Sequence, residues 1–127
     1  MGDKKSAEKA AEKAAEKVPA LPGAEVLDRL FATVQARKGA DPETSYTAKL
    51  YSRGTAKIAQ KVGEEAVEAI LEAVRGDKAA LAAESADLLY HLLVLWADLG
   101  LDPAEVWTKL AQREGTSGID EKKSRKA

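Results

Sequence analysis

The 127-residue chain contains no cysteine, a single histidine and few aromatic side chains, 5% of the total. Without cysteine it has no disulfide framework, thiolate nucleophile, iron–sulfur cluster or cysteine-based zinc site. It also lacks a charge surplus of either sign, because 20 lysine and arginine residues face 21 aspartate and glutamate residues, giving a net charge of -1. That balance argues against a nucleic-acid coat or a polybasic membrane binder, since both need a surplus of lysine and arginine.

Long apolar segments are missing as well. Residues 1–18 are charged throughout and lack the apolar core of a signal peptide. The longest apolar run, residues 88–97, is interrupted by His91 and is too short to span a bilayer. We therefore expect a soluble, cytoplasmic protein.

Composition divides the chain into three stretches. Residues 1–23 combine an Ala-Glu-Lys repeat with a proline-containing linker, and they predict a flexible extension. Residues 24–115 form the predicted folded domain, and residues 116–127 form a polar tail. Residues 18–119 hold 11 basic and 15 acidic side chains, so the acid surplus lies in the folded part.

Apolar residues at helical spacing, bounded by capping residues, predict four main helices and no strand. The first covers residues 24–38, and residues 47–52 add a short helical turn. The second begins with Thr55 as its N-cap and ends at Gly76, and the third runs from Asp77 to Gly100. The fourth has Asp102 as its N-cap and ends at Gly115. The predicted class is an all-α bundle.

Two of these helices carry narrow acidic stripes on otherwise apolar surfaces. At about 100° per residue, every charge from Lys57 to Arg75 falls on one side of the second helix. Glu84, Asp87 and Asp98 share a face of the third helix, together with His91. A surface helix has the opposite proportions, with a narrow apolar stripe. We therefore expect both helices to be packed on several sides, with the core completed by dimerisation.

Antiparallel packing of these helices would bring the two acidic lines together. Their repulsion and desolvation would be costly without a cation. Oxygen ligands favour Mg²⁺ or Mn²⁺. Di-iron sites of helical bundles need Glu-x-x-His pairs, whereas this chain has Glu65-x-x-Glu68 and Glu84-x-x-Asp87. From spacing alone, a solvated acidic face remains the alternative to a metal site.

The two acidic pairs, separated by fifteen residues, resemble the metal site of the all-α, MazG-like nucleotide pyrophosphohydrolases. The flanking segments SYTAKLYSRGT, ESADLLYHLLVLWADLGL and LAQREGTSGIDEKKSR are similar to those of the phosphoribosyl-ATP pyrophosphohydrolase family. The resemblance covers about residues 26–125. The resemblance does not extend to the Ala-Glu-Lys segment. In this family the activity is often fused to a metal-binding cyclohydrolase half, which needs cysteine residues that this chain lacks. We therefore expect the free-standing form.

The resemblance implies a magnesium-dependent enzyme, with Mn²⁺ as a possible substitute. Its reaction would be hydrolysis of 1-(5-phosphoribosyl)-ATP to 1-(5-phosphoribosyl)-AMP and pyrophosphate, the second step of histidine biosynthesis, in a homodimer. The implied metal ligands are Glu65, Glu68, Glu84 and Asp87. Glu64 or Glu68 would hold or deprotonate the attacking water.

A polyphosphate substrate also needs cationic side chains. Lys57 and Lys61 precede the acids on the same stripe and are candidates, although both could simply form ion pairs with Glu64 and Glu65. The resemblance adds Lys49 and Arg53 upstream, and in the tail it adds Arg113, Ser117, Lys122 and Arg125. The tail could equally be a basic end with no role in binding.

Three functions are compatible with these residues. The family resemblance favours the phosphoribosyl-ATP pyrophosphohydrolase reaction. A MazG-like house-cleaning hydrolase of other nucleoside triphosphates would share the acidic pairs but would not require the flanking segments. A non-catalytic helical interaction module would require neither metal nor turnover.

We expect His91 to be a helix-face residue or a partner of the site rather than a metal ligand. We expect Tyr46 either to stack or hydrogen-bond or to be an ordinary core or loop residue.

Overall fold

The computed structural model describes residues 22–115 and 117–126. Residues 1–21 of the predicted flexible extension, which covers residues 1–23, therefore lie outside the described part. Two compact units divide between Leu30 and Phe31. The described residues are helical and contain no strand, which confirms the all-α class. Their helices are α2 (Val26–Ala36), α3 (Tyr46–Arg53), α4 (Thr55–Arg75), α5 (Lys78–Leu99), α6 (Pro103–Ala111) and α7 (Gly118–Lys126).

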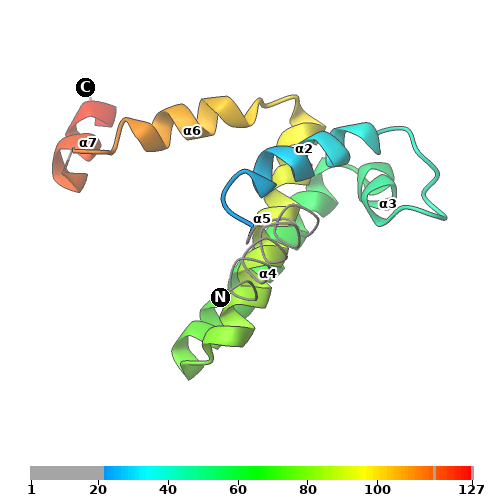
Figure 1. The fold of residues 1–127 in the computed structure, drawn as a ribbon, viewed down its shortest axis with the longest axis horizontal. Helices are drawn as coiled ribbons and strands as arrows, with labels where there is room; N and C mark the ends of the chain where they lie inside the picture. The colour runs from blue at the N-terminus through cyan, green and yellow to red at the C-terminus, as the bar shows by residue number, and fades with distance from the viewer. Residues whose placement is uncertain (1–21, 116, 127) are drawn as a thin grey trace, which may run out of the picture. The chain divides into compact units, whose positions relative to one another are not determined.

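The helices α4 and α5 form a long antiparallel hairpin, which Figure 1 shows in green and yellow-green. The turn between them is short because Gly76 adopts φ +75° and donates its backbone N–H to carbonyls of the last turn of α4. Asp77 then caps α5 by accepting a hydrogen bond from the N–H of Ala80 at 3.0 Å. Both were predicted from the sequence, since a left-handed C-cap favours glycine and an N-cap favours aspartate.

The predicted N-cap of α4 is wrong. Thr55 is the first helical residue, and Gly54 with φ +89° occupies the cap position without a side-chain hydrogen bond. The Thr55 hydroxyl instead donates to the Asp98 carboxylate at 2.5 Å, joining the start of α4 to the end of α5. A hydroxyl can serve either purpose, and this tertiary partner, 43 residues away, is not visible in local sequence.

The short α3 packs on both helices of the hairpin. Ser45 caps it by accepting from the N–H of Ala48 at 3.1 Å, and the Tyr51 hydroxyl donates to the backbone carbonyl of Val34 at 2.9 Å. The helix confirms the turn predicted over residues 47–52 and extends it slightly. The buried core lies around these contacts, and its hydrophobic members are Val34, Ala48, Leu50, Ile58, Leu93, Val94 and Ala97.

The α4–α5 hairpin leaves much of its apolar surface uncovered in the single chain. Ile58 is the buried residue of α4, whereas Ile70 is 60% exposed and Val74 is 83% exposed. The 22 residues of α5 are together long and apolar enough to cross a membrane by length and composition, a test that core helices of soluble proteins also pass. We predicted that both helices would be covered on several sides, and one chain alone does not cover them.

The C-terminal helices differ from the prediction. The fourth predicted helix ends at Ala111 rather than near Gly115, and a turn follows. Trp107 of α6 meets Trp96 of α5 edge to face, with ring centroids 5.8 Å apart, as expected of packing aromatics. The polar tail, predicted without a helix, includes α7, in which the one large apolar residue, Ile119, is 70% exposed. Apolar periodicity could not predict this helix, because α7 has no apolar face.

Candidate functional site

The turn of the hairpin sets the positions of the two acidic pairs. Glu65 and Asp87 each lie 11 residues from Gly76 along the chain, and Glu68 and Glu84 each lie eight residues from it. In an antiparallel hairpin, residues equidistant from the turn come to the same level. The α4 and α5 stripes therefore meet between these pairs, as the sequence predicted.

Three carboxylates converge there. Glu65, Glu84 and Asp87 can each offer an oxygen such that all three atoms lie within 4.8 Å of one another. Glu65 and Glu84 are half-buried and Asp87 is exposed. The Oε2 atoms of Glu65 and Glu84 are buried and have no hydrogen-bond partner. A buried oxygen without a donor is costly, so these two atoms fit a site that a cation completes.

The proton affinities of this cluster reflect the crowding of acids. The hydrogen-bond contact with Glu68, together with burial, raises the pKa of Glu84 to about 7. Burial raises the pKa of Glu65, and the neighbouring Glu68 carboxylate adds to that shift. Glu68, itself exposed, thus belongs to the same cluster. Acids whose charged forms destabilise one another are suited to a divalent cation, which replaces the proton and offsets the repulsion.

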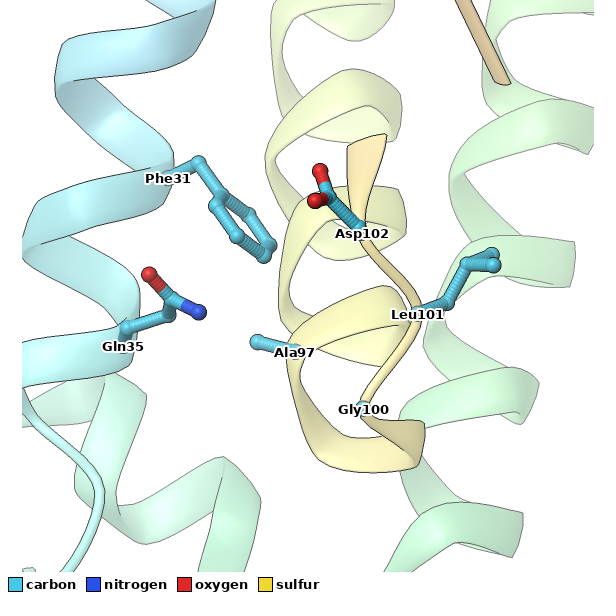
Figure 2. Close-up of a pocket in the computed structure, with 6 residues that line it drawn as sticks. All are labelled: Phe31, Gln35, Ala97, Gly100, Leu101 and Asp102. Atoms are coloured by element: carbon cyan, nitrogen blue, oxygen red, sulfur yellow. The ribbon is translucent and has the colours of Figure 1, made fainter. Parts of the chain in front are cut away.

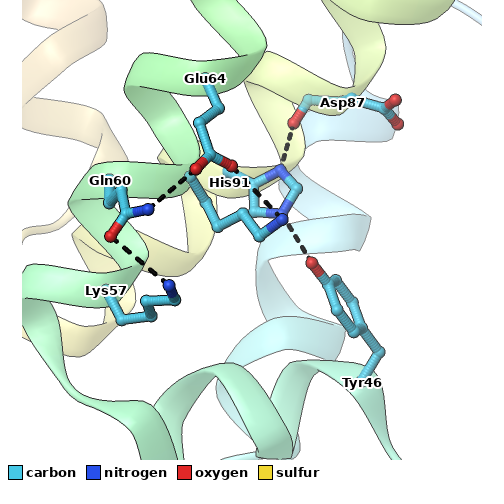
Figure 3. Close-up of polar contacts among 7 residues, drawn as sticks. Tyr46, Lys57, Gln60, Glu64, Asp87 and His91 are labelled. Atoms are coloured by element: carbon cyan, nitrogen blue, oxygen red, sulfur yellow. Dashed lines mark hydrogen bonds and ion pairs between the residues drawn. The ribbon is translucent and has the colours of Figure 1, made fainter.

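Glu64 has different surroundings, although it is the next residue to Glu65. Its side chain is exposed, and its carboxylate accepts a hydrogen bond from Gln60 Nε2 at 2.8 Å (Figure 3). The carboxylate also lies 3.5 Å from Lys61 Nζ. The Gln60 hydrogen bond and the Lys61 charge lower the pKa of Glu64. Glu64 is therefore ionised at neutral pH, and its low proton affinity makes it a weaker base than an unpaired glutamate.

The predicted phosphate-binding residues fall into three groups, of which two lie on α4 and α3. Lys61 forms the ion pair with Glu64 that the sequence allowed, and Lys57 Nζ lies 3.5 Å from Gln60 Oε1. Both lysines are half-buried on the stripe that leads to the carboxylates. Lys49 and Arg53 are exposed on α3, which packs on the same hairpin.

The remaining predicted residues lie toward the C-terminus. Ser117 accepts a hydrogen bond from the N–H of Asp120 at 3.1 Å at the start of α7. Arg113 follows α6, and Lys122 and Arg125 are exposed on α7. Among the described helices, extensive packing is confined to α3, α4 and α5. The helices α6 and α7 are not part of this packing.

A cavity of about 330 Å³ lies elsewhere in the second unit (Figure 2). It is lined by Phe31, Gln35, Ala97, Gly100, Leu101 and Asp102. Ala97 is ten residues beyond Asp87 on α5, or about 15 Å along a helix axis. With one charged side chain in its lining, this cavity offers no ligand set for a polyphosphate or a metal.

Sequence reasoning missed Gln60 as a polar partner. It expected His91 to be a helix-face residue or a partner of the site and Tyr46 to stack, to hydrogen-bond or to be an ordinary core or loop residue, but it did not join the two. Gln60 orients the Glu64 carboxylate, and the i,i+4 spacing of the two residues could have revealed it. His91 is hydrogen-bonded to Tyr46, which lies 45 residues away and on another helix. No local pattern reports a contact over that separation.

Residues 27–114 match the family model described as phosphoribosyl-ATP pyrophosphohydrolase. A phosphoribosyl-ATP pyrophosphatase of Azospirillum brasilense is 83% identical over 104 residues, which cover 82% of this chain and 94% of the relative. Relatives with the same name in Paramagnetospirillum magneticum and Rhodospirillum rubrum are 61% and 58% identical over 102 and 105 residues. These matches cover 80% and 83% of this chain and 94% and 90% of the relatives.

Proposed function

Because the chain belongs to the phosphoribosyl-ATP pyrophosphohydrolase family, we propose that it hydrolyses 1-(5-phosphoribosyl)-ATP to 1-(5-phosphoribosyl)-AMP and pyrophosphate in histidine biosynthesis. The structural observation that supports this reaction most is the carboxylate cluster of the hairpin. Three acidic oxygens lie within 4.8 Å, and two carboxylates of the cluster have buried oxygens without a hydrogen-bond partner. Such a cluster fits a divalent cation, and reactions at phosphoanhydrides commonly use one.

The proposed Mg²⁺ ligands are Glu65, Glu68, Glu84 and Asp87, and Mn²⁺ suits the same oxygen donors. When bound, the ion would neutralise phosphate charge and orient the anhydride. The chain's own residues supply the other requirements. The hairpin holds the carboxylates at two neighbouring levels, and Glu65 and Glu84 each keep one oxygen out of bulk water.

Proton transfer and phosphate binding fall to residues around the cluster. Glu64 is ionised and held by Gln60 and Lys61, so it can orient a water by accepting its hydrogen bond. Glu68 is exposed beside the cluster and is the second candidate for accepting the water's proton. Lys57 and Lys61 lie on the same stripe, where their charges can meet phosphate oxygens. The proposed phosphate-binding set also includes two residues of α3, Lys49 and Arg53, and four residues toward the C-terminus, Arg113, Ser117, Lys122 and Arg125.

We propose that the active form is a homodimer in the cytoplasm. Six large apolar side chains on α4 and α5 are 43–83% exposed in one chain, and they are Val67, Ile70, Leu71, Val74, Leu89 and Leu99. Contiguous apolar surface of this kind marks an interface. A second copy that covered it would also explain why α5 is apolar enough to resemble a membrane span while carrying Glu84 and Asp87, charges that are costly in a bilayer.

A substrate assay tests the proposed reaction. Pyrophosphate release is measured with phosphoribosyl-ATP, ATP, dUTP and dCTP, with and without Mg²⁺. We expect a clear preference for the first substrate and dependence on the metal. Equal turnover of dUTP or dCTP would indicate a house-cleaning hydrolase instead.

Matched variants test the site. Glu68→Gln and Asp87→Asn should remove turnover while leaving helix content unchanged, because each replaces a charged ligand by a neutral amide. Glu72→Gln is the control, since Glu72 lies one turn beyond Glu68 on α4 and pairs with Arg75 at 3.1 Å. Full activity in Glu68→Gln and Asp87→Asn would contradict the proposed site.

A further inference from the structure

The most enclosed titratable side chain of the described residues is His91 on α5, which is 5% exposed. Both of its ring nitrogens have partners. Nδ1 lies 2.7 Å from the backbone oxygen of Asp87, and Nε2 lies 3.0 Å from the Tyr46 hydroxyl (Figure 3). Because a buried polar ring is stable only when its hydrogen bonds are made, these two contacts fix the orientation of the imidazole ring.

The chemistry of the partners gives the direction of each hydrogen bond. A backbone carbonyl can only accept, so His91 Nδ1 carries a proton and donates to Asp87. In the neutral ring Nε2 is then the acceptor, and the Tyr46 hydroxyl donates to it. Two hydrogen bonds in series therefore connect Tyr46, at the start of α3, through the His91 imidazole to the backbone carbonyl of Asp87, a proposed metal ligand.

A second contact lies beside the first. The hydroxyls of Thr47 and Tyr90 are hydrogen-bonded, so two consecutive residues of α3 hold two consecutive residues of α5. The Tyr46 and Tyr90 rings are nearly parallel, 6.2 Å apart, and both meet His91 edge-on. Thr47 is buried, whereas Tyr46 is 50% exposed. The hydroxyl of Tyr46 is thus directed to His91 although half of its side chain faces solvent.

The position of this contact on α5 matters for the site. His91 follows Asp87 by one helical turn, about 6 Å along the axis. The residue whose carbonyl receives the histidine proton is also the residue whose carboxylate contributes to the cluster. Ligand atoms need to be held within roughly 0.5 Å of the geometry that binds well. A contact that restrains this turn of α5 therefore restrains a ligand.

We propose that Tyr46 is a positioning residue of the hydrolase site that acts through His91. Its hydroxyl fixes the imidazole against the Asp87 carbonyl and so holds the 87–91 turn of α5 to the start of α3. The proposal rests on the proposed function in one respect, that Asp87 is a metal ligand. Tyr46 itself need not contact the substrate or the metal.

Tyr46→Phe is the sharpest test because it removes one oxygen and keeps the ring. The readout is Mn²⁺ binding to the full chain without substrate, measured by isothermal titration calorimetry and by electron paramagnetic resonance of the free ion. We expect about tenfold weaker binding, the lower end of the effect found when partners of metal ligands are removed. Tyr51→Phe is the matched control, since it removes a hydroxyl from the same helix whose acceptor is the Val34 carbonyl. It should bind Mn²⁺ as the unchanged protein does.

Nuclear magnetic resonance of the imidazole nitrogens gives a readout independent of metal. The chain has a single histidine, so its signals need no assignment by mutation. At mildly alkaline pH we expect an Nδ1–H tautomer, with an Nε2 signal that shifts in Tyr46→Phe and not in Tyr51→Phe. His91→Asn, which can keep the donor to Asp87 but cannot reach Tyr46, should weaken Mn²⁺ binding. Combined with Tyr46→Phe, it should add little, because both changes break one chain of contacts.

The outcomes separate this proposal from the proposed function. Unchanged Mn²⁺ affinity in Tyr46→Phe overturns the positioning role even if the enzyme hydrolyses phosphoribosyl-ATP. Equal weakening in Tyr46→Phe and Tyr51→Phe also overturns it, because that result indicates general loosening of α3. If the unchanged protein binds no Mn²⁺, both the metal site and the positioning role are wrong. If Tyr46→Phe alone loses affinity while phosphoribosyl-ATP is not a substrate, the proposed reaction is wrong and the positioning role stands.

Discussion

Competition between protons and the metal ion at Glu84 should make metal binding strongly dependent on pH. The pKa of Glu84 is raised to about 7, mainly by its hydrogen-bond contact with Glu68 and by burial. A divalent cation binds the ionised carboxylate, so binding must displace this proton. A group with this pKa is about 9% ionised at about pH 6 and about 91% ionised at about pH 8. We therefore expect Mn²⁺ affinity to rise about tenfold between these pH values.

Calorimetry can measure both the affinity and the proton. Titrations at about pH 6, 7 and 8 give the dissociation constants, and repeating them in buffers of different ionisation enthalpy gives the number of protons released. Release should approach one proton at the acidic end and fall toward zero at the alkaline end. Because the pKa of Glu65 is also raised, its proton adds to the effect rather than opposing it.

Two variants separate Glu84 from other carboxylates. Glu84→Gln should bind Mn²⁺ weakly and lose most of the pH dependence, because the titrating group is gone. Glu64→Gln should keep the pH dependence, since the Gln60 hydrogen bond and Lys61 hold the pKa of Glu64 below its ordinary value. An affinity that stays constant from about pH 6 to pH 8, without proton release, would refute this reasoning.

Three further predictions concern stability and assembly. The pKa of Glu84 in the folded state, about 7, lies above its ordinary value of 4.5, so the metal-free folded state binds more protons between these pH values. Urea denaturation should therefore show stability decreasing as pH rises from about 4.5 to about 7. Leu50→Ala should lower the free energy of unfolding by about 2–5 kcal/mol in the same assay, because Leu50 is fully buried and its truncation leaves a cavity. Ile70→Asp, at a position 60% exposed in one chain, should shift the protein to a monomer in sedimentation experiments without lowering its helix content; an unchanged sedimentation coefficient would place the dimer interface elsewhere.

The hairpin was predictable because its signals are local. Gly76 and Asp77 end and begin helices through their own backbone and side-chain properties, and both act where the sequence placed them. The acidic stripes follow from helical periodicity, and antiparallel packing then brings Glu65 to Glu84 and Asp87. The fold class and the carboxylate cluster both derive from these short-range rules.

Tertiary partners were not predictable in the same way. The Thr55 hydroxyl could cap its own helix or reach another one, and only packing decides that it donates to Asp98. Glu64 and Glu65 are adjacent and chemically identical, yet a neighbouring amide lowers the pKa of the first and burial raises that of the second. These differences in pKa depend on which side of α4 meets α5 and on which atoms surround each carboxylate. The sequence pattern does not specify those contacts.

The equal spacing of the acidic pairs about Gly76 has a consequence for folding kinetics. All four proposed ligands lie between residues 65 and 87, so closing the hairpin is enough to bring them together, and contacts of such short sequence separation form early. The same closure brings the negatively charged carboxylates close together, so that they repel one another before the rest of the chain has folded. We expect millimolar Mg²⁺ to speed refolding in stopped-flow experiments, because screening that repulsion removes an electrostatic barrier from the hairpin step.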